Sequence, residues 1–105
     1  MVPTWCNGVI ISNVSIMAPT WSPNTDGIEP LGCRNVRVSG CYVHNGDDCL
    51  TVKGGCEDVV IADSYFASGH GASVGSVTDV GAVLASAAFF GVPSSGFSTT
   101  NFAQV

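Results

Sequence analysis

The segments NGVIISNVSI (7–16), RNVRVSGCYV (34–43) and EDVVIADSYF (57–66) repeat one pattern of alternating β-branched residues around a small or polar residue. Such alternation predicts short strands, and the interrupting Asn, Gly and Asp predict tight bends. The equivalent positions are Val9, Val36 and Val59, then Ile11, Val38 and Ile61, then Ile16, Val43 and Phe66, with Asn13, Gly40 and Asp63 at the bend.

This repeat decides the expected fold. Repeating units of this length built only from short strands predict a parallel β-helix, in which each coil pairs with the coils above and below it. No apolar stripe of helical period and length occurs in residues 1–77, so the chain is expected to be all-β. Residues 1–77 would supply about three to four coils, stacked about 4.8 Å apart.

The same period brings distant polar residues into one column. Asp26, Asp48 and His70 follow one another at equal intervals along the chain, and each interval is close to the repeat length. In coils of about that length the three side chains stack, with Asp47 beside them. Each motif alone could be an ordinary turn, because Asn-Gly, Asp-Gly and Gly-Asp are common turn formers. Their shared spacing favours a cluster.

A cluster of carboxylates has a specific chemical use. Like charges at short range raise the pKa of at least one member, which then carries a proton. Glycoside hydrolysis needs one protonated carboxyl group to donate to the leaving oxygen and one ionised carboxylate to activate water or attack carbon. The residues therefore predict a sugar-cleaving site at Asp26, Asp47, Asp48 and His70.

Three motifs carry a family resemblance: SPNTDG (22–27), GDDC (46–49) and SGHGASVGSV (68–77). In order and spacing they resemble three of the four signature motifs of the polygalacturonases, glycoside hydrolase family 28. The resemblance covers residues 1 to about 77. It implies a right-handed parallel β-helix and cleavage of α-1,4 links between galacturonates, or of related links in rhamnogalacturonan, with inversion and without a metal or other cofactor.

The resemblance also implies roles for the clustered residues. Asp47 matches the general acid, Asp26 and Asp48 match the carboxylates that hold and activate water, and His70 matches the histidine that supports their protonation. A general rule disagrees on the stereochemistry, because carboxyl groups about 5 to 5.5 Å apart usually indicate retention. Backbone spacing does not fix carboxyl spacing, so inversion is the expectation here.

The chain departs from the family in its cations. The fourth motif, Arg-Ile-Lys or similar, supplies cations that hold the substrate carboxylate, but no Arg or Lys follows Lys53. Lys53 is a candidate substitute for substrate binding; its alternative is a solvated side chain on a strand. The missing cations leave a second hypothesis, a β-helix that binds pectin without cutting it, and a third, an inactive β-solenoid piece.

A second departure is length. The resemblance implies a β-helix of about ten coils, so this chain is expected to be a piece of a longer enzyme. Residues 78–105 lose the strand rhythm, hold a single charge at Asp79, and are expected to be either a tail unrelated to the family or a segment that caps the last coil.

Composition excludes some partners and locations. The net charge is −5 with only three basic residues, so no basic surface for nucleic acid is expected. The apolar stretch at 81–92 is too short to span a bilayer. The N-terminus shows no secretory signal, although the resemblance implies a secreted, cell-wall protein that acts on pectic polysaccharide as a monomer.

The five cysteines leave two interpretations open. Cys6, Cys33, Cys41, Cys49 and Cys56 contain no Cys-x-x-Cys spacing and have no neighbouring histidine, so a zinc site is not expected. They could form one or two disulfides, or fill the core as small apolar side chains.

Overall fold

The chain is built from short parallel strands. The computed structural model describes residues 1–74 and the backbone of residues 87–90. Within these residues there are strands but no helix. The strands are β1 (Asn7–Ser12), β2 (Ser15–Met17), β3 (Arg34–Ser39), β4 (Tyr42–His44), β5 (Leu50–Val52), β6 (Glu57–Ala62), β7 (Tyr65–Phe66), β8 (Ala72–Val74) and β9 (Ala87–Phe90).

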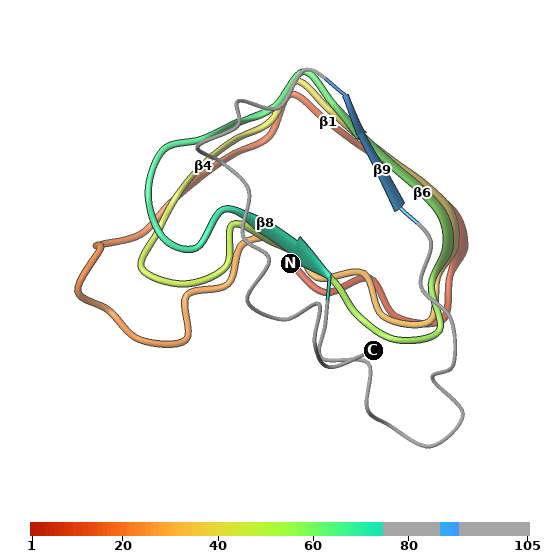
Figure 1. Ribbon diagram of the computed structural model, residues 1–105, viewed down its shortest axis with the longest axis horizontal. Coiled ribbons are helices and arrows are strands. Elements are labelled where there is room, and N and C mark those ends of the chain that lie inside the picture. Colours follow the sequence, from red (N-terminus) through yellow and green to blue (C-terminus); the bar gives the residue numbers. More distant parts are fainter. Residues whose placement is uncertain (75–86, 91–105) are drawn as a thin grey trace.

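The strands form three parallel sheets that the chain visits in turn. Their orders are β1-β3-β6-β9, β2-β4-β7 and β5-β8. Viewed along the stack, successive coils nearly superpose, as Figure 1 shows. The paired positions include Val9, Val36 and Val59 in the first sheet, and Ile16, Val43 and Phe66 in the second. The predicted register and the all-β class are confirmed, and the arrangement is consistent with a parallel β-helix.

Each bend between the first and second sheets uses a residue with positive φ. Asn13, Gly40 and Asp63 have φ angles of 56°, 64° and 51°. The left-handed region favours Gly, and Asn and Asp tolerate it better than other residues. These three residues therefore let the strand turn a corner at the same point of every coil, as the repeat predicts.

The core is a column of inward-facing apolar side chains. Val36, Val38, Val43 and Ile61 are at most 1% exposed, and four of the cysteines are buried with them. All five cysteines are free thiols, and Cys6 is exposed. The structure therefore supports the interpretation of Cys33, Cys41, Cys49 and Cys56 as core-filling residues and contains no disulfide between the five.

The C-terminal segment is described only in part. The backbone of β9 pairs in parallel with β6, from Val59 opposite Ala87 to Ala62 opposite Phe90. The rest of the predicted tail at 78–105 lies outside the described residues, so the division of the chain at residue 77 stays a prediction. In the described part, no helix is long and apolar enough to cross a membrane.

Packing predicts that truncating two isoleucines to alanine has very different effects on stability. Ile61 is completely buried, whereas Ile10 is 81% exposed. Truncating Ile61 leaves a cavity between coils, so Ile61→Ala is expected to lower the free energy of unfolding by about 2–4 kcal/mol. Ile10→Ala is the matched control and should change it by less than about 0.5 kcal/mol. Urea unfolding followed by circular dichroism measures both, and equal effects would contradict the assigned core.

Candidate active site

The candidate active site is formed by one turn from each of three coils. Asp26 lies in the loop between β2 and β3, Asp47 and Asp48 lie between β4 and β5, and His70 lies between β7 and β8. Ile28 pairs with Leu50, and Leu50 pairs with Ala72. Asp26, Asp48 and His70 each precede these residues by two positions, so they occupy equivalent places in successive coils, as their equal spacing predicts.

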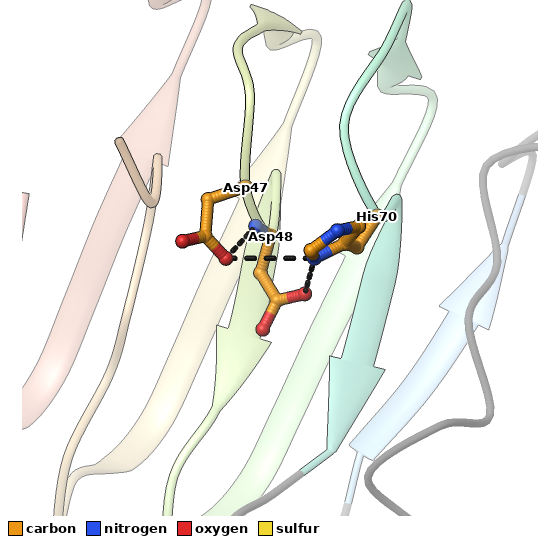
Figure 2. Close-up of side chains that lie close together, drawn as sticks. All are labelled: Asp47, Asp48 and His70. Atoms are coloured by element: carbon orange, nitrogen blue, oxygen red, sulfur yellow. Dashed lines mark hydrogen bonds and ion pairs between the residues drawn. The ribbon is translucent and has the colours of Figure 1, made fainter. Parts of the chain in front are cut away.

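The side chains of Asp47, Asp48 and His70 converge (Figure 2). His70 Nδ1 lies 3.3 Å from Asp48 Oδ1 and 3.5 Å from Asp47 Oδ1. The side chain of His70 is 62% exposed, that of Asp47 is 26% exposed and that of Asp48 is 10% exposed. The imidazole therefore bridges two carboxylates from the neighbouring coil on a face that a ligand can reach.

The two adjacent aspartates are held in fixed positions. Asp47 Oδ1 accepts a hydrogen bond from the Asp48 N–H at 2.8 Å, and Thr51 Oγ1 donates to Asp48 Oδ2 at 2.9 Å. The His70 N–H donates to the Asp47 carbonyl oxygen at 2.9 Å. Because each carboxylate has a separate anchor, the pair keeps its geometry without a bound ligand.

Asp26 is the carboxyl group with the altered acidity. Its pKa is raised from 3.8 to about 7, chiefly by burial and then by hydrogen bonding and like charge from Glu29 and Asp47. A carboxyl group with this pKa is protonated in mildly acid solution. The predicted cluster thus includes one carboxyl group that is protonated in mildly acid solution, at a residue to which the resemblance assigns water activation. The sequence did not single out Glu29. A signal was present, because Glu29, Thr51 and Ser73 are separated by the same interval as Asp26, Asp48 and His70, and Thr51 pairs with Ser73.

The raised pKa of Asp26 predicts a pH-dependent stability. The folded chain binds this proton more tightly than the unfolded chain, so the stabilisation is complete below about pH 4 and is lost as pH rises through 7. Asp26→Asn removes the charge. The change that it makes in the free energy of unfolding, relative to the parent chain, should therefore be more stabilising at pH 8 than at pH 4.5. The difference is expected to be on the order of 1 kcal/mol, because solvent screens a partly open carboxyl group.

Urea unfolding of Asp26→Asn at both pH values measures this effect. The control is Asp63→Asn, since Asp63 is exposed at a bend where the first coil has Asn13. An Asp26→Asn effect that is the same at pH 4.5 and pH 8 would contradict the raised pKa.

Asn45 is a positioning residue that the sequence reasoning missed. It is completely buried. Its Nδ2 donates to the carbonyl oxygens of Thr25, at 2.6 Å, and Asp48, at 2.9 Å, while its own backbone carbonyl accepts from Ser68 Oγ at 2.6 Å. One side chain and its backbone thus join all three turns of the site. The sequence held a signal for this contact. Asn45 and Ser68 are separated by the same interval as the paired residues of β4 and β7, which predicts that they lie side by side in neighbouring coils.

Lys53 lies at the opposite end of β5 from Asp47 and Asp48. It follows β5, whereas Asp47 and Asp48 precede this strand. The backbone N–H of Lys53 donates to Pro30 in the preceding coil. A substrate-binding role for Lys53 stays a prediction.

The same cluster has the geometry to ligate a cation. One ligand atom each from Asp47, Asp48 and His70 lies within 4.8 Å of the others. Two carboxylates and an imidazole suit several divalent metals, but such a cluster serves acid–base chemistry equally well. The expectation of a metal-free site therefore stays a prediction.

A pair of neighbouring carboxyl groups is what most glycoside hydrolases place at the bond they cleave. The family model Glycosyl hydrolases family 28 matches residues 1–86, and the chain belongs to this family. The match extends past Val77 into the segment predicted to differ from the family.

Plant proteins are among the relatives. Polygalacturonase ADPG1 of Arabidopsis thaliana is 46% identical over 74 residues, which are 70% of this chain and 17% of that protein. A probable polygalacturonase of Vitis vinifera is 45% identical over 60 residues, 57% of this chain and 12% of that protein. The polygalacturonase of Persea americana is 39% identical over 74 residues, which are 70% of this chain and 16% of that protein. The chain spans 12–17% of the length of these relatives.

Proposed function

We propose that this chain carries the catalytic centre of a pectin-degrading hydrolase that cleaves α-1,4 links between galacturonate residues. The observation that carries the proposal is the convergence of Asp47, Asp48 and His70 within 4.8 Å, next to a carboxyl group with a raised pKa. Membership of glycosyl hydrolase family 28, with relatives named polygalacturonase, supports the choice of substrate.

In the proposed mechanism each group has one role. Asp47 donates a proton to the glycosidic oxygen as the bond from this oxygen to the anomeric carbon breaks. Asp26 and Asp48 orient a water molecule, which attacks the anomeric carbon and gives up its proton to a carboxylate. His70 holds Asp47 and Asp48 in position.

Inversion is proposed on the basis of the family resemblance. The short distances between the carboxylates give the opposite expectation under the general separation rule, in which inverting pairs are about 6.5–9.5 Å apart. Proton NMR of the first products distinguishes the outcomes for an α-linked substrate. The β anomer supports a single displacement by water, and the α anomer overturns it.

We propose a right-handed parallel β-helix with about three to four coils in residues 1–77, because connections between parallel strands of one sheet are almost always right-handed. Residues 78–105 form the second segment. The protein would act as an extracellular monomer in the cell wall, on pectic polysaccharide and without a cofactor, nucleic acid or membrane.

The test is the release of reducing ends from polygalacturonic acid by the purified chain in mildly acid solution. Circular dichroism first verifies β structure, so that the assay reports on folded protein. Release that depends on Asp47 supports the proposal. Release that is unchanged in Asp47→Asn overturns it.

A pectin-binding protein that does not cut is the alternative, and the placement of the cations favours it. In the described part of the chain, both arginines form ion pairs with Glu57 and Asp58, and Lys53 lies at the far end of β5 from the aspartates. Calorimetric binding of oligogalacturonate by the folded chain, without new reducing ends, would support this alternative. If the folded chain shows neither binding nor cleavage, both proposed functions are excluded.

A further inference from the structure

A surface pocket lies beside the carboxylates and has no part in the mechanism above. Met17, Ala18, Pro19, Thr20, Trp21 and His44 line it, and we name it the tryptophan pocket. Its volume is about 570 Å³, within the range of about 300–1,000 Å³ that small-molecule sites occupy. Trp21 is 83% exposed and Met17 is 72% exposed. Large apolar side chains held open to solvent commonly mark a binding surface.

An insertion in the first coil creates the pocket. Met17 pairs with His44, and Ile28 pairs with Leu50. The loop from Met17 to Ile28 is therefore longer than its counterpart from His44 to Leu50 in the next coil. Figure 1 shows this loop, in orange, projecting beyond the other coils at the lower left. The longer loop includes the Pro-Thr-Trp-Ser-Pro stretch at 19–23.

The inserted loop rests on the turn that carries the catalytic aspartates. The Ala18 N–H donates to the His44 carbonyl at 2.7 Å, and the Gly46 N–H donates to Thr25 Oγ1 at 3.0 Å. A side chain on Gly46 would overlap the carbonyl oxygens of Thr20 and Ser22. Because Asp47 follows Gly46 directly, the loop that lines the pocket is in contact with the turn that carries Asp47.

The lining favours an uncharged sugar. An indole ring offers a flat apolar face for the C–H groups of a pyranose. In the described part of the chain the lining contains no carboxylate, Arg or Lys. Arg34 and Arg37 lie on β3, where they pair with Glu57 and Asp58 of β6. Figure 1 shows the sheet of β1 and β6 on the opposite side of the coils from the loop.

Apart from the His44 imidazole, the described lining has no group that can carry a positive charge, so an ionised galacturonate in this pocket would lose hydration for at most one cationic partner, and it would meet the negative charge of the aspartates. A galacturonate methyl ester avoids both penalties and adds a methyl group that can pack on apolar side chains. Resting on the proposed function, we infer that the tryptophan pocket is a sugar-binding subsite that selects methyl-esterified galacturonate over free galacturonate beside the cleavage site.

The test compares fully methyl-esterified hexagalacturonate with the same oligosaccharide after saponification, which exchanges each methyl ester for a charged carboxylate. Calorimetry uses the Asp47→Asn chain at pH 7.5 and low ionic strength, so that neither ligand is cut. We expect the ester to bind at least about tenfold more tightly, and Trp21→Ala to remove about tenfold of this affinity. Trp5→Ala is the matched control, since Trp5 is 75% exposed but lies outside the pocket.

Each outcome of this test has one meaning. Equal or tighter binding of the free acid overturns the inference, as does a Trp21→Ala chain that retains the preference for the ester. Absence of binding by both ligands overturns it as well. The proposed hydrolase is tested separately, because reducing-end release that depends on Asp47 can persist when the ester preference fails.

Discussion

Asp47→Asn is expected to lower kcat for polygalacturonate hydrolysis by about 10²–10⁴-fold, the range typical of a lost general acid. An amide cannot supply a proton to the leaving oxygen. The substitution preserves the shape of the side chain, and an amide oxygen can still accept the hydrogen bond that Asp47 Oδ1 receives from the Asp48 N–H. The loss should therefore appear in catalysis and not in folding.

Kinetics of reducing-end release, with kcat and KM determined separately, measure this prediction. KM should change by less than about threefold if Asp47 acts mainly in the transition state. Asp63→Asn serves as the control, because Asp63 is an exposed acid at a bend and belongs to no part of the site. A kcat for Asp47→Asn within about threefold of the parent chain would exclude Asp47 as the acid.

Gly69→Ala is expected to have the largest effect on stability near the site. Gly69 has a φ of 74°, and a β-carbon there would overlap the Asp47 carbonyl oxygen and Asn45 Oδ1. The left-handed backbone costs Ala about 1 kcal/mol, and relief of the overlap adds about 1–3 kcal/mol. The free energy of unfolding should fall by about 2–4 kcal/mol. Activity should fall too, because separating the coils breaks the bond from the His70 N–H to Asp47.

Gly8→Ala separates these two contributions. Gly8 has a similar φ of 83°, but no atom lies within 4 Å of the β-carbon position. It should cost about 1 kcal/mol, the conformational part alone. Urea unfolding measures the loss of stability in both variants. The loss in Gly69→Ala minus the loss in Gly8→Ala is the part caused by the close packing of the coils. Equal losses for Gly8→Ala and Gly69→Ala would show that the close approach at Gly69 contributes nothing.

The repeat in the sequence determined the register of the coils. A side chain alternates between faces at every residue of a strand, so a register error of one position would expose the whole core face. This constraint is why Val9, Val36 and Val59 could be aligned from sequence alone, and why positive-φ bends fell at Asn13 and Asp63. The same periodicity placed Asp48 and His70 in neighbouring coils.

Only the tertiary structure decided how the turns between strands pack. The raised pKa of Asp26 depends first on burial and then on Glu29 and Asp47, and both the burial and the approach of Asp47 come from how the loops of neighbouring coils pack. The bond from Asn45 to Thr25 and the pocket at Trp21 arise likewise where the inserted loop rests on the next coil. Sheet hydrogen bonds repeat along the chain and can be read from spacing, whereas turn contacts depend on each loop's own conformation.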